Sequence, residues 1–119
     1  MNYTISYERR PGYLYVQIEG IEKFEAAVDF WENLVRKCKD DNIEKILIVD
    51  KVSGKLKTIE IHRLSVIVAK LIAGLNIAFI DPKEETYSSN AFGETVVANN
   101  GGMAKLFRTE KEGIKWLLS

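Results

Sequence analysis

The sequence predicts a single α/β domain spanning residues 1–119, with a mixed five-stranded sheet and four helices in the order ββαβαβαβα. Two short unbroken apolar runs, Ile46–Val49 and Ile77–Ile80, are typical of strands covered on both faces of a sheet. Segments with helical spacing of apolar residues alternate with these strands. Because helices join strands 2–5, we expect these strands to be parallel with right-handed crossovers, and strand 1 to be antiparallel to strand 2.

The chain opens with the pattern of a β-hairpin. Apolar or aromatic residues alternate with polar ones over Tyr3–Glu8 and again over Leu14–Ile18, which indicates strands with one face less buried than the other. Between them, the segment Arg10–Tyr13 places proline and glycine at the two central positions of a turn.

An apolar stripe with helical periodicity predicts the first long helix, over Lys23–Lys39. Phe30 lies beside this stripe, either at the margin of the core or on a contact surface. Cys38 is the only cysteine, so no disulfide framework or thiolate cluster is expected. It falls on the apolar side of the helix and is predicted to be a buried structural thiol.

The stretch Lys45–Leu64 contains a strand-to-helix junction. Asp50 ends the strand, Ser53 and the following glycine break the chain, and the hydroxyl of Thr58 is placed to cap a second helix that runs to Ile72. Apolar residues extend most of the way round this helix, which indicates deep burial or a contact between two copies of the chain. We therefore expect a homodimer.

The next elements are a strand, a polar loop and a third helix. Asp81 and the proline after it end the strand Ile77–Ile80. The polar segment Lys83–Ser88 is predicted to be a loop, after which Ser88, Ser89 or Asn90 caps the helix.

A short strand and a final helix complete the chain. The strand is predicted over Met103–Phe107, and Arg108 follows it directly. Thr109 with Glu112 three residues later matches a capping box at the start of the last helix.

Composition limits the classes of partner. The formal net charge is zero, with 17 basic and 17 acidic residues, which argues against nucleic acid as a partner. The apolar segment Leu64–Ile80 is interrupted by Lys70, Gly74 and Asn76 and is short for a membrane span. The N-terminus has no apolar core of a signal peptide. We expect a cytoplasmic protein without a cofactor.

The carboxyl edge of the parallel strands is the predicted functional region, because ligands and partners of open α/β sheets bind there. The candidate partner or ligand edge comprises Asp50, Ser53, Thr58, Asp81 and Arg108.

Asp50 and Asp81 allow two interpretations. Two carboxylates at adjacent strand ends could hold Mg²⁺ or act as an acid–base pair, which is the chemistry of a small enzyme. Each could instead accept main-chain hydrogen bonds of its own turn. We favour the second interpretation and expect no catalytic residue. With His62 as the only histidine, no zinc site is predicted.

The last third of the chain also resembles a known family. The segments NIAFID, FGETVVANNGG, AKLF, TEKEG and IKWLLS resemble the terminal elements of the STAS domains, the anti-sigma-factor-antagonist family. They are more similar still to small STAS-like relatives without assigned activity. By topology the resemblance covers nearly the whole chain. It implies a non-catalytic regulatory module that acts through contacts with a protein partner.

The resemblance also points to the junction after the third strand. STAS regulators carry a D-S-S-G-like motif there, whose serine is phosphorylated to break a protein complex. This chain reads DKVSGKLKTIE instead, so Ser53 comes too early, and Thr58 stands nearest the helix start as the candidate phosphorylation site.

A third interpretation comes from the broad fold alone. It is similar to that of the CRAL-TRIO lipid-binding domains, which implies a pocket for a small hydrophobic ligand or lipid. An open edge at the strand ends would favour the interaction module, whereas a lined pocket would favour the ligand binder.

Overall fold

A computed structural model describes residues 3–119 and contains one five-stranded sheet in the order β1-β2-β3-β4-β5. β1 is antiparallel to β2, and β2 to β5 are parallel, as predicted. The elements are β1 (Thr4–Arg10), β2 (Tyr13–Ile21), α1 (Phe24–Asp41), β3 (Lys45–Ser53), α2 (Thr58–Leu71), β4 (Asn76–Ile80), α3 (Glu84–Asn99), β5 (Ala104–Phe107) and α4 (Glu110–Leu117). This order confirms the fold class expected from the sequence.

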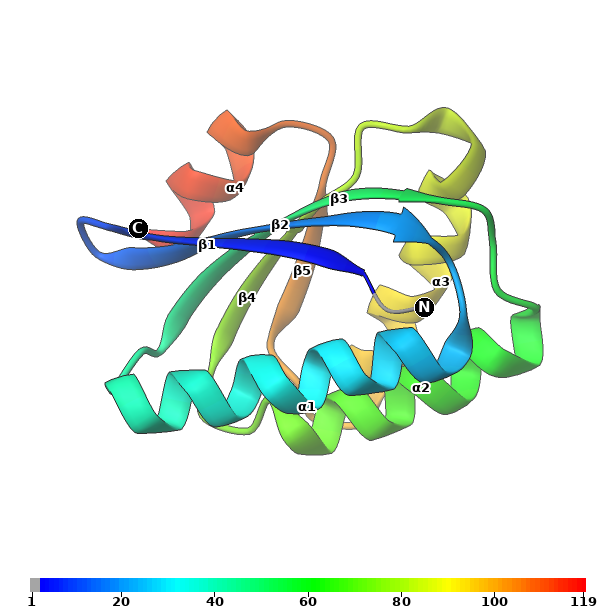
Figure 1. Cartoon of the computed structure of the whole chain (residues 1–119), viewed down its shortest axis with the longest axis horizontal. Helices are drawn as coiled ribbons and strands as arrows, with labels where there is room; N and C mark the ends of the chain where they lie inside the picture. The colour runs from blue at the N-terminus through cyan, green and yellow to red at the C-terminus, as the bar shows by residue number, and fades with distance from the viewer. Residues whose placement is uncertain (1–2) are drawn as a thin grey trace.

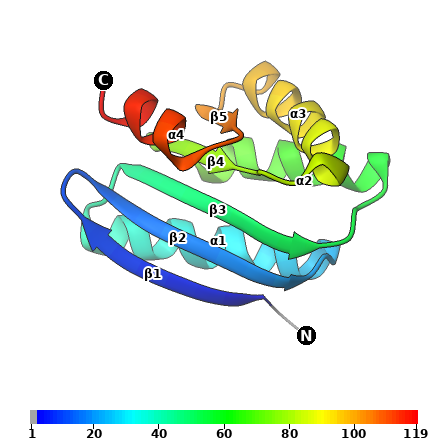
Figure 2. The ribbon, with the colours of Figure 1, turned by 90° about the horizontal axis from the view of Figure 1, so that it is seen from above.

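The helices lie on both faces of the sheet. α1 and α2 run side by side below it, and α4 lies above it (Figure 1). α3 packs against α2 and β5, and seen from above it stands beside the β5 end of the sheet, while β1 forms the opposite edge (Figure 2). The molecule is therefore a three-layered α/β structure whose larger core lies between the sheet and α1, α2 and α3.

Alternation along β3 divides its side chains between two cores. Ile46 and Ile48 enter the larger core, whereas Leu47 and Val49 face α4. Because side chains of a strand alternate between faces, Asp50 lies on the same face as Ile46 and Ile48. The functional consequence is that Asp50 points toward the layer of α1, α2 and α3.

The predicted hairpin and the first helix are present. Gly12 has φ of 86°, the left-handed conformation that glycine adopts readily in the turn between β1 and β2. α1 extends to Asp41 and is followed by Asn42 in the left-handed conformation. Phe30 is 2% exposed, so it belongs to the core and not to a contact surface. Cys38 is 1% exposed, which confirms a buried thiol.

Two predicted helix starts are wrong. Thr58 does not cap α2, because Lys57 occupies the N-cap position and the carboxylate of Glu60 accepts a hydrogen bond from the Lys57 amide at 3.0 Å. The segment Lys83–Ser88 is not a loop, since α3 already begins at Glu84.

The early start of α3 has a physical cause. The carboxylate of Asp81 accepts the Lys83 amide at 3.0 Å and the Thr86 hydroxyl at 2.6 Å, so it supplies acceptors at the amino end of the helix. Asn90, predicted as a cap, lies well inside α3.

α4 is held close to the upper face of the sheet. A Cβ added at Gly113 would lie 2.5 Å from Ile80 Cδ1 and 3.3 Å from Leu47 Cδ1, so a larger residue there would have to displace the Ile80 side chain. Its start is capped as predicted, because the Thr109 hydroxyl accepts a hydrogen bond from the Glu112 amide.

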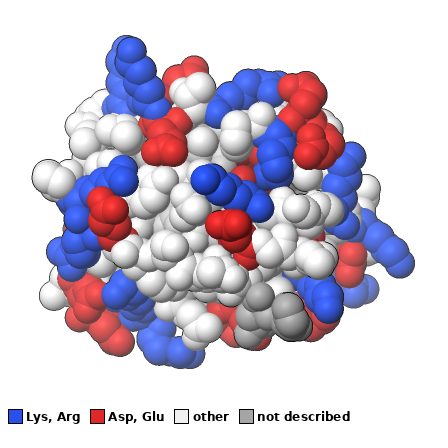
Figure 3. All heavy atoms as spheres, turned by 45° about the horizontal axis from the view of Figure 1, so that its top comes forward, with Lys and Arg blue, Asp and Glu red and all other residues white. Residues whose placement is uncertain are grey.

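The surface carries charges of both signs. On the face shown in Figure 3, basic and acidic side chains alternate around an uncharged area, in keeping with the zero net charge. Over residues 3–119, no helix has the length and apolar character needed to cross a membrane.

Candidate functional site

The ends of β3 and β4 bring two aspartates together. Asp50 lies near the end of β3 and Asp81 directly follows β4, its neighbour in the sheet. Asp50 is 6% exposed and Asp81 is 0% exposed. Burying two carboxylates is costly unless cations and hydrogen bonds compensate them, so the surroundings of this pair decide what it can do.

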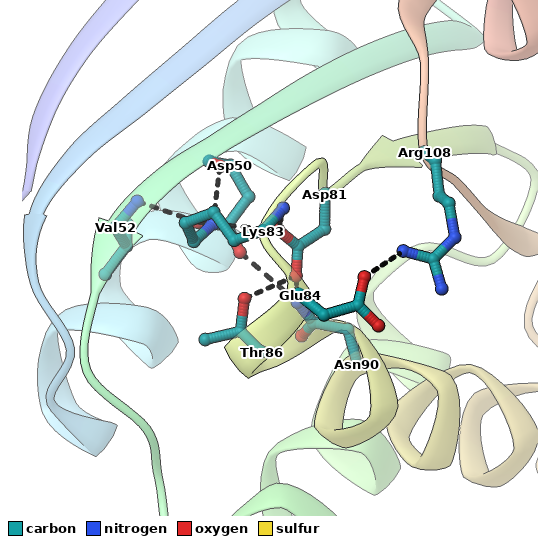
Figure 4. Close-up of polar contacts among 8 residues, drawn as sticks. All are labelled: Asp50, Val52, Asp81, Lys83, Glu84, Thr86, Asn90 and Arg108. Atoms are coloured by element: carbon teal, nitrogen blue, oxygen red, sulfur yellow. Dashed lines mark hydrogen bonds and ion pairs between the residues drawn. The ribbon is translucent and has the colours of Figure 1, made fainter.

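Lys83 supplies the compensating charge (Figure 4). Its Nζ lies 2.9 Å from Asp81 Oδ1 and 3.5 Å from Asp50 Oδ1. The same nitrogen donates a hydrogen bond to the main-chain carbonyl of Asp50 at 2.7 Å. One ammonium group thus donates two hydrogen bonds and forms ion pairs with both carboxylates at the strand ends.

Asn90 of α3 joins the two carboxylates from below. Its Nδ2 lies 2.7 Å from Asp81 Oδ2 and 3.3 Å from Asp50 Oδ2. Main-chain amides complete the set, since Asp50 accepts the Val52 amide at 2.9 Å and Asp81 accepts that of Lys83 at 3.0 Å. We call Asp50, Asp81, Lys83, Thr86 and Asn90 the strand-end cluster.

The two carboxylates have pKa values that move in opposite directions. Burial works to raise the pKa of Asp81, but the hydrogen bonds from Thr86, Lys83 and Asn90 together outweigh it and lower the pKa. For Asp50, burial dominates and raises the pKa, although the main-chain hydrogen bond and the charge of Lys83 oppose it. Asp81 is therefore held as the anion more firmly than Asp50.

These contacts argue against a metal ion shared by the two aspartates. The ammonium of Lys83 lies between Asp50 and Asp81, and each carboxylate accepts the main-chain amide two residues further along the chain. Over the part of the chain that the structure describes, no group of three or more His, Cys, Asp or Glu side chains could hold a metal ion.

The other residues of the predicted edge lie outside the strand-end cluster. Ser53 is exposed, and its main-chain carbonyl accepts the Glu22 amide at 2.8 Å. Thr58 is exposed in the first turn of α2. Arg108 is exposed, and its Nη1 pairs with Glu84 Oε2 at 3.0 Å. The structure thus brings together only two of the five predicted residues.

A cavity lies directly below the strand-end cluster. It has a volume of about 120 Å³, is partly open to solvent, and lies between the lower face of the sheet, α1, α2, α3 and the segment that joins β3 to α2. Asp50, Thr86 and Asn90 belong both to the cluster and to its wall. Its apolar wall consists mainly of Ile18, Phe30, Trp31, Ile61, Leu64, Val68, Phe79, Val97 and Leu106. The strand ends therefore lead into a lined pocket.

The exposure of individual wall residues reflects this cavity. Phe79 lies on β4, which has a neighbouring strand on each side, and faces the larger core, yet it is only half-buried. Leu64 of α2 is also half-buried although it packs against that core. The rings of Trp31 and Phe79 are stacked, with centroids 6.3 Å apart and an interplanar angle of 19°.

Polar groups interrupt the apolar wall at a few places. Glu22 lines the cavity and accepts hydrogen bonds on Oε1 from the Tyr3 hydroxyl and the Lys23 amide. Burial is the main reason that the pKa of Glu22 is raised, and the nearby negative charge of Asp50 adds to it. A few polar groups in an otherwise apolar pocket are typical of a small-molecule binding site.

The sequence implied a pocket only through the resemblance of the broad fold, and it identified neither the place of this cavity nor most of its polar groups. Trp31 and Phe79 have the apolar spacing of ordinary core residues, and packing alone decides whether such residues fill a space or line it. Ser65 gave one signal, because a hydroxyl on the apolar face of a buried helix needs a polar neighbour. Lys83 was assigned to a loop, so its position between the aspartates was not foreseen.

Comparisons with known proteins support the fold and add no function. No family profile and no curated protein matches the chain. A solved structure of an uncharacterized protein of the DUF3478 family from Shewanella loihica PV-4, described as having a SpoIIAA-like fold, is similar to it with a TM-score of 0.56. The two share 17% sequence identity, and the match covers 98% of this chain and 94% of the other. This chain therefore has a SpoIIAA-like, that is STAS-like, α/β fold.

Proposed function

We propose that the protein is a non-catalytic binder of a small, largely hydrophobic ligand, held in the cavity between the sheet and α1, α2 and α3. The observation that carries this proposal is the aromatic-lined cavity of about 120 Å³ that adjoins the strand ends. A cavity of roughly 150 Å³ lined by apolar side chains is large enough to bind benzene. The expected ligand portion is therefore one aromatic ring or a short alkyl chain.

The strand-end cluster supports binding in preference to catalysis. Lys83, Asn90 and main-chain amides already hold both carboxylates in fixed positions. Because Asn90 belongs to α3, its hydrogen bonds to the two carboxylates hold α3 against the sheet. The cluster thereby shapes the wall of the cavity. The sequence favoured an interaction module over ligand binding, and the lined cavity reverses that order.

A retained ligand is the first test. Freshly purified protein is analysed by native mass spectrometry and again after denaturation. We expect a mass excess that denaturation releases, because the transfer of apolar surface from the pocket into water is unfavourable. A native mass equal to that of the bare chain in every preparation argues against the proposal.

A regulatory protein-interaction module is the second candidate, and one observation favours it. Ile59 is 58% exposed in the first turn of α2, next to the exposed hydroxyl of Thr58. An exposed apolar side chain beside a hydroxyl that a kinase can reach suits a contact that phosphorylation of Thr58 would weaken. Such a contact would join two copies of the chain or the chain and a regulatory partner.

The oligomeric state tests this second candidate. Size-exclusion chromatography with light scattering at micromolar concentration should show a dimer, and Ile59→Lys should convert it to a monomer. Replacing an exposed lysine of the same helix, Lys70→Glu, serves as the control. A monomer for the unmodified protein removes the homodimer.

A further inference from the structure

We propose that the cavity selects a ligand whose apolar part is joined to a positively charged amine, so that the natural ligand is a small arylalkyl- or alkylamine and not a fatty acid. This inference rests on the proposed function and specifies its ligand class. It depends on which charged and polar groups lie in the wall, and on which of them still have acceptor capacity.

The buried charge in the wall is negative. Asp50 is buried, Glu22 and Glu94 are half-buried, and all three line the cavity. Lys55 and Lys105 also lie at its border, but both are exposed, so water solvates their ammonium groups. A ligand that enters the cavity therefore approaches three carboxylates, of which Asp50 is already paired with Lys83, and no desolvated cation of the wall.

Glu22 has an oxygen available for a ligand. Its Oε1 accepts the Tyr3 hydroxyl and the Lys23 amide, whereas Oε2 accepts no hydrogen bond from residues 3–119. Glu94 also has one oxygen engaged, since its Oε2 accepts the Leu106 amide at 2.6 Å. An ammonium ion has three donors and no acceptor, which matches a carboxylate oxygen that lacks a partner.

Ser65 places a hydroxyl in the same wall. It is 5% exposed and lines the cavity. Gly93 on α3 lies opposite, where an added Cβ would be 3.1 Å from Ser65 Oγ. Because a hydroxyl oxygen can accept a hydrogen bond, Ser65 suits the donors of an ammonium group.

The aromatic wall fits the same ligand class. Phe30, Trp31 and Phe79 form a chain of neighbouring rings, with centroid distances of 5.4 Å and 6.3 Å. Their faces attract both the ring of an aryl group and the positive charge of an amine. Lys83 compensates the charge of Asp50, but a carboxylate ligand would still meet the like charge of Glu22, which makes its binding unfavourable.

Three probes of similar size separate charge from shape. Phenethylamine is cationic at pH 7, phenylacetate is anionic and ethylbenzene is neutral. Chemical-shift titrations of ¹⁵N-labelled protein give a dissociation constant for each. We expect phenethylamine to bind about ten-fold tighter than ethylbenzene, a difference of about 1.4 kcal/mol, and phenylacetate to bind more weakly than both.

The outcomes distinguish this inference from the proposed function. If phenylacetate binds as tightly as phenethylamine while ethylbenzene also binds, the charge selection is wrong and the hydrophobic pocket stands. If none of the three shifts the amides of wall residues, the pocket itself is wrong and this inference falls with it.

A substitution of Glu22 tests whether this residue causes the preference for a positively charged ligand. Glu22→Gln keeps an acceptor for the Tyr3 hydroxyl and removes the negative charge, so it should weaken phenethylamine about ten-fold and leave ethylbenzene unchanged. Glu19→Gln, an exposed neighbour on β2, should change neither. Equal amine affinity of Glu22→Gln and the unmodified protein overturns the proposal.

Discussion

The side-chain amide of Asn90 joins Asp50 and Asp81, with Nδ2 at 3.3 Å from Asp50 Oδ2 and 2.7 Å from Asp81 Oδ2. One residue of α3 thereby connects the ends of two neighbouring parallel strands. Since the cavity lies between α3 and these strands, the same contact fixes part of its wall. The stability of the fold and the shape of the pocket depend on the same polar cluster.

Asn90→Ala should lower the free energy of unfolding by about 2 kcal/mol, because two buried carboxylates lose a hydrogen-bond donor. Asn99→Ala, at an exposed position of the same helix, should cost much less. Urea denaturation at pH 7 measures both. Equal midpoints for the two variants would show that the bridge between the aspartates contributes nothing to stability.

Lys83→Met should be more damaging than Asn90→Ala. It leaves Asp50 and Asp81 buried without their cation, and breaking a buried ion pair costs roughly 3 kcal/mol or more. Lys51→Met removes an exposed lysine from β3 and should change the urea midpoint little. A small effect of Lys83→Met would mean that the two carboxylates are protonated or solvated without it.

Glu22→Gln should change how stability depends on pH. Burial raises the pKa of Glu22 in the folded protein, so the folded state holds the proton more tightly than the unfolded state. The unmodified protein should therefore gain stability relative to Glu22→Gln as the pH falls through this raised pKa. The gain should be complete below the ordinary pKa of the carboxyl group. Urea titrations of both proteins at several pH values between 7 and 4 measure the difference, and a constant difference contradicts a raised pKa.

Much of the fold was predictable because it depends on local patterns. An unbroken apolar run such as Ile46–Val49 buries all its side chains only in a strand that is covered on both faces of the sheet. Helical connections between such strands make them parallel. The turn at Gly12 and the cap at Thr109 follow from the conformations and hydrogen bonds of single residues. Each of these features is encoded within a few neighbouring positions.

The rest was not predictable because it depends on contacts between distant segments. α3 starts early since Asp81 accepts hydrogen bonds from Lys83 and Thr86, and its sequence has only weak apolar periodicity. Lys83 reaches Asp50 across 33 positions of sequence. No local sequence pattern predicts the cavity, because it is a space between three helices and a sheet.

The most direct test of the pocket is a titration of ¹⁵N-labelled protein with ethylbenzene, compared with the variant Ala27→Leu. Ala27 is buried and lines the cavity, so a larger side chain there should fill the space that the ligand needs. Ala98→Leu, on the exposed side of α3, is the matched control. We predict saturable shifts at wall residues for the unmodified protein and for Ala98→Leu, and none for a folded Ala27→Leu. Saturable binding that Ala27→Leu leaves unchanged, or no binding to the unmodified protein, would contradict a ligand site in this cavity.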